Sequence, residues 1–432
     1  MLDLFFSRAF FALLLAVAVI WAPAPFAGAS AFTLKTLHSY CYTPDYPTCI
    51  DGSQPLAGLL KDGSGNLYGT TSKGGKYGGG FVFKLVPNGS KYSEFGLHNF
   101  CAKANCADGS NSDSDLIMDV DGNLYGTAYA GGKYNRGVIF KLAHGESGWR
   151  FSVLHNFCNG GCANGAGPLS GLTYAGQATG SLYDGTSPLY GTAAFGGQYN
   201  NGTAYRLTHN GSLWKHTVIH SFKTSYGPDA LVMDPAGNLF GTVRYGGRYG
   251  GGLMYELADG TWNQTILHEF CGTLNCADGR EPYGRLALDS AGNLFGTTYK
   301  KGAGAQCTVD DGCGVVFERL ADGRFRVLYN FCSNVNCTDG DGPLAGVIVH
   351  NGKLFGTTNW GGDTADGVGT VFELTETKGN WAETVLYSFC NAQCDDGEHP
   401  QAPVIMDGSG NLFGTTSFYG KRVGGTAFEL TP

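Results

Sequence analysis

One short phrase recurs seven times along the chain and constrains its fold more than any other feature. Asn66-Leu67-Tyr68-Gly69-Thr70 returns with small changes at 123–127, 188–192, 238–242, 293–297, 353–357 and 411–415. Successive copies begin 57, 65, 50, 55, 60 and 58 residues apart. A period that varies while the phrase persists indicates one supersecondary unit that carries loops of variable length.

Each copy contains four short strand candidates separated by turn residues. In the first copy they are 55–60, 66–70, 81–85 and 92–100. The sequence Asp-Gly-Ser-Gly-Asn at 62–66 joins the first two and is typical of a tight turn. Short strands at close intervals, without a helical apolar period, predict an all-β protein with one four-stranded antiparallel sheet per repeat. Radial packing of these sheets is a seven-bladed β-propeller.

The two ends of the repeat series complement each other. The last copy stops after its third strand, 425–430, whereas an additional fourth strand, 32–40, precedes the first copy. We therefore expect the N-terminal strand to complete the last blade and close the ring, which removes an exposed sheet edge. A β-helix is the alternative architecture, but it needs shorter coils and gives no complementary ends.

The composition agrees with a turn-rich β protein. The 432 residues include 70 glycines and 15 prolines, and only 15% are charged while 13% are aromatic. The aromatic content argues against disorder, and glycine without a three-residue period argues against collagen. A net charge of −8 leaves no excess of positive charge to attract the phosphates of a nucleic acid, so we expect no nucleic-acid partner.

The first residues have the features of a secretory signal peptide. An apolar run at 9–21 follows Arg8 and precedes the small residues 27–31. We expect residues 1–29 to be the signal peptide, with cleavage after Ala29 or Ala31, and residues 30–432 to form a single β-propeller domain. A retained membrane anchor is the alternative. The expected product is a secreted monomer, extracellular or periplasmic, without membrane association after cleavage.

The cysteines occur in pairs that are close in sequence. In a chain with a signal peptide, an even number of cysteines predicts disulfides formed in an oxidising compartment. The alternative, zinc binding, would need ligands to converge from separate repeats, and we expect neither a metal nor another cofactor. The pairs are Cys41/Cys49, Cys101/Cys106, Cys158/Cys162, Cys271/Cys276, Cys307/Cys313, Cys332/Cys337 and Cys390/Cys394.

The repeated phrases resemble a known family. The combination "PLAGLLKDGSGNLYGTTSKGG…FVFKLVPNG" with "TVLYSF" covers essentially the whole chain after the signal peptide. It is similar to the GloVer tandem-repeat family of secreted proteins, often classed as choice-of-anchor. The resemblance implies a propeller-like repeat protein of unassigned biochemical activity, and it carries over no catalytic residue.

Two sets of loops should share one face of such a propeller. One set joins the second and third strands and is rich in glycine, cations and aromatic residues; the other contains the cysteine pairs followed by Asp-Gly. Aromatic faces flanked by hydrogen-bonding groups suit sugar rings. The candidate ligand-binding residues are Lys76, Tyr77, Lys133, Tyr134, Tyr199, Arg248, Tyr249, Trp360 and Tyr419.

A scaffold role is the alternative for any residue that recurs in every blade. Asp-Gly forms turns, and a repeated tyrosine can pack between blades. The same reasoning applies to five histidines that share one position in the fourth strand, because Tyr329 and Tyr387 replace them in the last two copies. A half-buried polar aromatic residue explains this exchange better than a metal ligand or a general base. The histidines are His38, His98, His155, His220 and His268.

Residues that break the repeat are better candidates for chemistry. On the first strands, which should line the channel, Asp115 and Arg285 replace glycine, and Asp229 lies nearby in the fourth copy. A carboxylate in a narrow channel can have a raised pKa and act as an acid, or it can pair with Arg285 and bridge the channel. We treat these three residues as catalytic candidates.

The sequence therefore supports three functional hypotheses. The first is a non-catalytic propeller that binds a glycan or cell-surface polymer through its loop face. The second is a carbohydrate-active enzyme, a lyase or hydrolase, that uses the channel residues. The third is a protein-interaction scaffold. The first predicts solvent-exposed tyrosine and tryptophan rings, the second predicts polar residues that converge at one site, and the third predicts rings buried between blades.

Overall fold

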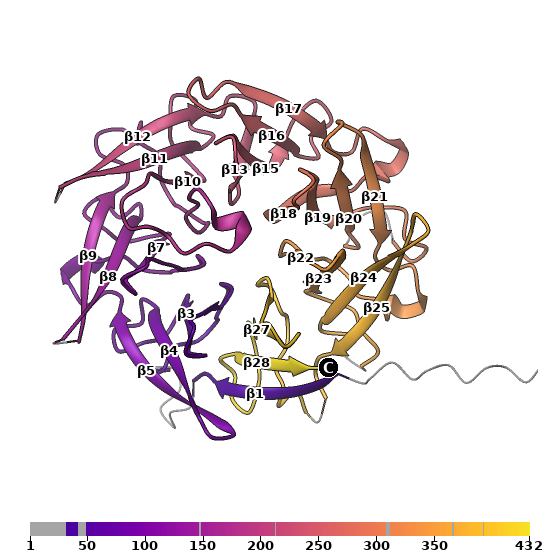
Figure 1. The fold of residues 1–432 in the computed structure, drawn as a ribbon, viewed down its shortest axis with the longest axis horizontal. Helices are drawn as coiled ribbons and strands as arrows, with labels where there is room; N and C mark the ends of the chain where they lie inside the picture. The colour runs from indigo at the N-terminus through magenta and orange to yellow at the C-terminus, as the bar shows by residue number, and fades with distance from the viewer. Residues whose placement is uncertain are drawn as a thin grey trace, which may run out of the picture. The chain divides into compact units, whose positions relative to one another are not determined.

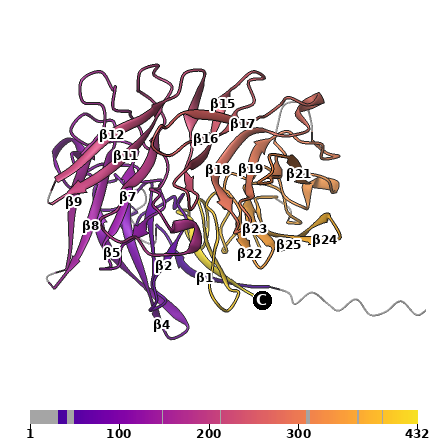
Figure 2. The ribbon, with the colours of Figure 1, turned by 45° about the horizontal axis from the view of Figure 1, so that its top comes forward.

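The structure is a computed structural model that describes residues 32–41, 49–146, 148–211, 213–307, 312–364, 367–391 and 393–432. The expected signal peptide, 1–29, lies outside these residues. Residues Phe32–Pro432 form one unit, in which the described strands make seven antiparallel sheets around a central axis (Figures 1 and 2). The predicted all-β, seven-bladed propeller is confirmed.

Blades 1, 2, 5 and 6 each contain four strands that run in chain order from the centre of the ring to its rim (Figure 1). Their strands are β2 (Leu60–Lys61), β3 (Leu67–Thr71), β4 (Phe81–Asn88) and β5 (Lys91–Asn99); β6 (Ile117–Met118), β7 (Leu124–Ala128), β8 (Val138–Gly145) and β9 (Gly148–Asn156); β18 (Arg280–Leu288), β19 (Leu294–Lys300), β20 (Val315–Arg319) and β21 (Phe325–Asn330); and β22 (Ile348–His350), β23 (Lys353–Thr358), β24 (Thr370–Thr377) and β25 (Asn380–Ser388).

Blades 3 and 4 have irregular innermost strands. In blade 3 this strand is reduced to a single bridge between Thr173 and Tyr190, and in blade 4 it is split into two pieces that both pair with β15. The strands are β10 (Leu189–Ala193), β11 (Thr203–Asn210) and β12 (Leu213–Ser221) in blade 3, and β13 (Ser225–Pro228), β14 (Val232–Met233), β15 (Leu239–Gly246), β16 (Leu253–Leu257) and β17 (Gln264–Glu269) in blade 4.

Four short 3-10 turns complete the described secondary structure. Three follow the first cysteine of a pair, and the fourth, η2, belongs to the insertion that makes the third repeat the longest. The turns are η1 (Ala104–Cys106), η2 (Gln177–Thr179), η3 (Leu274–Cys276) and η4 (Val335–Cys337). No helix among the described residues is long and apolar enough to cross a membrane.

Blade 7 is assembled from both ends of the propeller. Its strands are β26 (Ile405–Met406), β27 (Leu412–Thr416), β28 (Thr426–Thr431) and β1 (Thr33–Ser39). The N-terminal strand β1 pairs antiparallel with β28, from Thr33 opposite Thr431 to Ser39 opposite Thr426. Figure 1 shows the indigo β1 beside the yellow β28. This pairing confirms the expected ring closure.

The repeated phrase builds the contact between blades. Its glycine lies opposite an aromatic ring of the third strand: at Gly126, a Cβ atom would come within 2.7 Å of Phe140. Its threonine hydroxyl donates a hydrogen bond to a carbonyl of the next blade's innermost segment, as Thr127 does to Ser170 at 3.0 Å. The equivalent donors are Thr70, Thr192, Thr297, Thr357 and Thr415.

The hydrophobic core lies between the blades. Among the described residues there are seven clusters of buried apolar side chains, and each is shared by two adjacent sheets. In the cluster between blades 1 and 2, for example, Phe100 of blade 1 contacts Phe140 of blade 2 edge to face at 5.4 Å. Burial of these rings is the main force that holds the ring together.

The cysteine pairs form disulfides as predicted. All seven sequence-local pairs are bonded, and no described cysteine is free. Bonded cysteines offer no thiolate to zinc, so the alternative of a cysteine zinc site does not hold in this structure. Disulfides persist in oxidising compartments, and these seven fit an extracellular or secreted protein.

Candidate functional site

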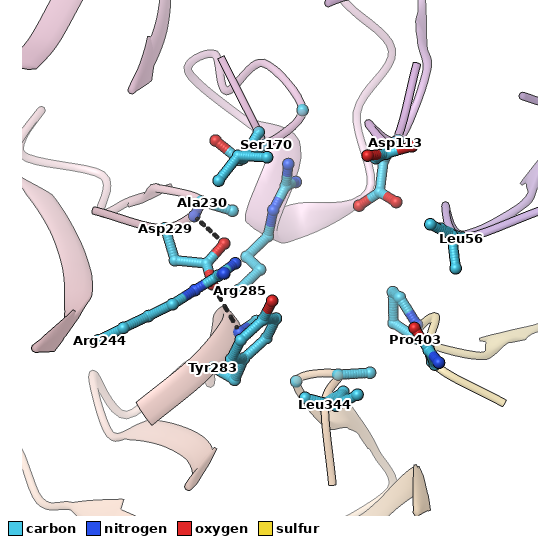
Figure 3. Close-up of a pocket in the computed structure, with 17 residues that line it drawn as sticks. Leu56, Asp113, Ser170, Asp229, Ala230, Arg244, Tyr283, Arg285, Leu344 and Pro403 are labelled. Atoms are coloured by element: carbon cyan, nitrogen blue, oxygen red, sulfur yellow. Dashed lines mark hydrogen bonds and ion pairs between the residues drawn. The ribbon is translucent and has the colours of Figure 1, made fainter. Parts of the chain in front are cut away.

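A cavity of about 170 Å³ lies in the central channel, where all seven blades contribute to its wall (Figure 3). The structure brings the three predicted channel residues, Asp115, Asp229 and Arg285, into this wall together. The lining residues are Leu56, Asp113, Asp115, Leu169, Ser170, Gly171, Asp229, Ala230, Arg244, Tyr283, Gly284, Arg285, Leu344, Ala345, Gly346, Gln401 and Pro403.

Asp229 is held by a buried ion pair with Arg244. The distance from Arg244 Nη2 to Asp229 Oδ2 is 3.2 Å, and the side chains are only 17% and 8% exposed. The Arg244 guanidinium also stacks 3.4 Å from the centre of the Tyr283 ring (Figure 3). Burial raises the pKa of Tyr283 to about 12, although the Arg244 charge opposes this shift. The result is a fixed group of carboxylate, guanidinium and phenol.

Asp115 and Arg285 do not form the expected bridge across the channel. The Asp115 carboxylate accepts a hydrogen bond from the backbone N–H of Gly58 at 2.7 Å, and Arg285 Nη2 donates to the Leu172 carbonyl at 3.3 Å. Among the described residues, no carboxylate lies within ion-pair distance of Arg285. The charge pair of the channel is instead Asp229 with Arg244, because blade 4 supplies both partners, Arg244 from β15 and Asp229 from the segment between β13 and β14.

Asp113 and Arg285 retain unused hydrogen-bonding capacity. Asp113 Oδ1 and Arg285 Nε are buried atoms without a hydrogen-bond partner among the described residues. Burial raises the pKa of Asp113, and a hydrogen bond from Ser72 and the charge of Lys73 only partly oppose this effect. The cavity therefore offers a carboxyl group that protonates readily and a guanidinium N–H that is free to bind a small polar group.

The glycine-rich loops rest on the cysteine loops, so the two sets share one face as predicted. In blade 2 the backbone N–H of Gly132 donates to the Cys106 carbonyl at 2.8 Å. Gly131 and Gly132 both have positive φ, 70° and 78°, which favours glycine at these positions. The equivalent contacts join Gly75 to Cys49, Gly197 to Cys162, Gly302 to Cys276, Gly362 to Cys337 and Gly420 to Cys394.

Four tyrosines occupy the same loop position in four consecutive blades, and we call them the tyrosine arc: Tyr77, Tyr134, Tyr199 and Tyr249. The side chains of Tyr77, Tyr199 and Tyr249 are 49%, 41% and 48% exposed, and Tyr134 is half-buried. The cations Lys76, Lys133, Lys223 and Arg248 each lie within 6 Å of an arc ring. A scaffold role requires these rings to be buried between blades, and they are not.

The arc loops are held in place by side chains of the outer strands. Asn99 Oδ1 accepts the backbone N–H of Lys76, and Asn156 Oδ1 accepts that of Lys133, both at 2.7 Å. In blade 4, Glu269 accepts the N–H of Arg248 at 2.6 Å. These bonds fix the loops before any ligand arrives, which lowers the entropic cost of binding.

The remaining predicted aromatic residues lie elsewhere on the loops. Trp360 and Tyr419 are 43% and 49% exposed, but neither occupies the loop position of the arc. Trp360 contacts His399 edge to face at 4.2 Å.

The carboxylates of the Asp-Gly turns are not presented on this face. Asp108, Asp278, Asp339 and Asp396 are buried. Each bonds the histidine or tyrosine of its outer strand, as His98 Nε2 does with Asp108 at 3.0 Å. The shared histidine position is thus a scaffold feature, and the face presents aromatic rings and cations without these carboxylates.

Arg244 is a site residue that the sequence reasoning missed. It lies three residues after the glycine of the repeated phrase, where the other copies have Ser72, Tyr129, Ala194, Tyr299, Asn359 and Ser417. A search for repeat-breaking residues on second strands as well as first strands would have found it, because it is the one charged residue in this position.

Solved structures with a similar fold include carbohydrate-active proteins. A protein described as an ancestral GH74 enzyme matches with a TM-score of 0.56 and 11% identity, over 88% of this chain and 47% of that chain. The GH74 xyloglucanase from Xanthomonas campestris gives 0.53 and 14%, over 89% and 52%. The extracellular domain of a putative one-component system from B. thetaiotaomicron gives 0.53 and 10%, over 92% and 40%.

These likenesses show the fold alone, and the chain spans about half or less of each of those three proteins. No curated protein sequence matches the chain. A family model described as the Gloeobacter/Verrucomicrobia repeat matches residues 28–188 and 178–428. This match confirms the resemblance seen in the repeated phrases, and the chain belongs to the Gloeobacter/Verrucomicrobia repeat family.

Proposed function

We propose that this protein is a secreted, non-catalytic binding propeller for an acidic polysaccharide of a cell surface or matrix. One observation carries the proposal: the tyrosine arc repeats a tyrosine ring with a neighbouring cation at one loop position in four consecutive blades, and three of the four residues are 41–49% exposed. A polymer with regularly spaced sugar rings can use such a repeated surface, because each ring stacks on a tyrosine while each carboxylate meets a cation.

Two further features support this proposal. The loops are held by hydrogen bonds from the outer strands, so little ordering is needed on binding. The disulfides fit the oxidising environment in which such polymers occur. The fold is similar to that of two GH74 proteins, and a propeller of this kind can therefore act on or bind carbohydrate.

Binding to polygalacturonate and to a neutral β-glucan, measured by affinity electrophoresis and calorimetry, tests the proposal. We expect retention by polygalacturonate that weakens with added salt, and about tenfold weaker binding in Tyr134→Ala or Tyr249→Ala. Phe95→Ala is the matched control, because this ring is 53% exposed on the outer strand β5, away from the loops. Failure to bind any acidic polysaccharide, or an equal loss in the control variant, would sink the proposal.

A second candidate function is a polysaccharide lyase or hydrolase at the central cavity. It is favoured by the convergence of Asp113, Arg244, Tyr283 and Arg285 on one space. In a hydrolase mechanism Asp113, whose pKa burial raises, would donate a proton to the glycosidic oxygen as its bond to the anomeric carbon breaks and water adds to that carbon, while Arg285 would bind a sugar carboxylate. Release of reducing ends or unsaturated products by the parent and not by Asp113→Asn would favour this function; intact polymer after prolonged incubation would exclude it.

A further inference from the structure

At six junctions between blades, a histidine or tyrosine on the outer strand of one blade packs against a side chain of the next blade. In blade 1, His98 is bonded to Asp108 at 3.0 Å and is covered by Phe151 of blade 2, whose ring stacks at 3.8 Å. In blade 4, His268 is bonded to Asp278 at 3.0 Å and is covered by Phe325 at 3.6 Å. Hydrogen bonding and stacking satisfy both histidines, so these junctions need no ligand.

The junction that closes the ring is built differently. Its histidine, His38 on β1, is covered by Glu94 on β5, where His98 and His268 have a phenylalanine. His38 Nε2 lies 3.5 Å from Asp51 Oδ2 and 3.7 Å from Glu94 Oε1. Both distances exceed a normal hydrogen bond, and Nε2 and Oε1 are buried atoms without a hydrogen-bond partner among the described residues. A buried carboxylate oxygen without a partner is unfavourable.

A second residue also breaks the repeat at this junction. Tyr40 stands where the other copies have phenylalanine. It is fully buried, and its hydroxyl has no hydrogen-bond partner among the described residues. Its ring contacts His38 at 4.7 Å.

We propose that His38, Asp51 and Glu94 form a binding site for a divalent transition-metal ion, of which Zn²⁺ is the best match. The three ligand atoms lie within 4.8 Å of one another. Ligands about 2.1 Å from a tetrahedral zinc ion are separated by about 3.4 Å, close to the observed 3.5 and 3.7 Å. One imidazole with two carboxylates is a donor set that zinc uses in proteins.

The site joins the two ends of the ring. His38 belongs to β1, which completes blade 7, Glu94 belongs to β5 of blade 1, and Asp51 lies between β1 and β2 in the chain. The side chains of His38, Asp51 and Glu94 are 18%, 12% and 14% exposed, so an ion can enter from solvent. A bound ion would cross-link β1 to blade 1 and satisfy the two buried atoms that lack partners. It would therefore stabilise the closed ring.

Calorimetric titration of the chelator-treated full chain with ZnCl₂ tests the site. We expect one Zn²⁺ per chain and a higher melting temperature with Zn²⁺ than with chelator. Glu94→Gln and His38→Tyr should each weaken zinc binding at least tenfold. His38→Tyr suits this purpose, because Tyr329 and Tyr387 occupy the same position and donate to their loop aspartates at 2.8 and 2.6 Å.

Glu383→Gln is the matched control. Glu383 holds the position of Glu94 in β25 and is also a buried carboxyl group, but the residue beneath it is Tyr329 rather than a histidine. This variant should bind zinc as the parent does. No saturable zinc binding by the parent, or unchanged affinity in His38→Tyr, would overturn the proposal. If Glu94→Gln does not fold, His38→Tyr together with the X-ray absorption signature of imidazole in the parent decides the question.

Discussion

Asp229 Oδ2 accepts a hydrogen bond from the backbone N–H of Gly284 at 3.0 Å, and this bond joins blade 4 to blade 5. It occurs at the junction where the threonine link is missing, because the buried Thr242 hydroxyl has no hydrogen-bond partner within the described part of the chain. At the other six junctions the threonine of the repeated phrase makes the connection. The ion pair in the channel thus has a structural role beside any part in binding.

Removal of the Asp229 carboxylate should destabilise the ring strongly. Asp229→Ala leaves Arg244 buried without its counter-charge and breaks the bond to Gly284, so we expect a loss of about 3–5 kcal/mol in the free energy of unfolding. Urea unfolding followed by tryptophan fluorescence measures it. A loss below about 1 kcal/mol would show that solvent or another group compensates Arg244.

The threonine links allow a comparison between two positions of the same phrase. Thr127→Val removes a hydroxyl that donates to Ser170, whereas Thr242→Val removes a buried hydroxyl that bonds to nothing among the described residues. We expect Thr127→Val to cost about 1–2 kcal/mol and Thr242→Val to be neutral or stabilising. Thermal and urea unfolding of both variants check this, and equal losses would contradict it.

Glu383 should make stability depend on pH. Burial raises its pKa from an ordinary value near 4.5 to about 8, and the nearby Asp339 charge adds to this effect. The folded chain therefore binds a proton that the unfolded chain has released between these values. The stabilisation from protonated Glu383 is complete below about pH 4 and is lost as pH rises through about 8.

Glu383→Gln cannot titrate, so it should gain stability relative to the parent as pH rises. We expect the difference in unfolding free energy to move in favour of the variant by about 4 kcal/mol between pH 5 and pH 9. Unfolding curves at pH 5, 7 and 9 measure this difference. A difference that stays constant across these pH values would show that Glu383 has an ordinary pKa.

Loop fixation should contribute to polymer binding without contact with the polymer. Asn156→Ala removes the acceptor of the Lys133 N–H and frees the loop that presents Tyr134. Because the loop must then be ordered on binding, we expect about three- to tenfold weaker polygalacturonate binding with little change in unfolding temperature. Calorimetry with Ser152→Ala as the control, a half-buried change on the same strand β9, checks this.

Much of the fold was predictable because the scaffold repeats. The phrase around Gly69 and Thr70 marks every blade, and the surplus strand at 32–40 predicted the pairing of β1 with β28. The irregular innermost strand of blade 3 was not predicted, because its sequence retains the repeat pattern while only Thr173 keeps a bridge to Tyr190.

The candidate sites were predictable only where one position could be compared across copies. Asp115 and Arg285 break the first-strand pattern and do line the cavity. The pairing of Asp229 with Arg244 depends on how two strands of one blade meet, which no spacing in the sequence reveals. The role of Glu94 could not be predicted from its position in the repeat, because it depends on the ring closure that brings His38 beside it. The carboxylates of the Asp-Gly turns lie in loops and yet are buried, because each bonds the histidine or tyrosine of its outer strand.

The pairing of β1 with β28 also sets the order of assembly. Lys35 and Glu429, which form an ion pair across these strands, are 394 residues apart. During synthesis β1 emerges before any blade and has no partner strand until the last blade exists. Contacts between such distant residues form slowly, and an unpaired strand edge favours aggregation in the meantime. We therefore expect the newly made chain to be most prone to aggregation through β1 until β28 is complete, and a chain interrupted before β28 to keep that edge open.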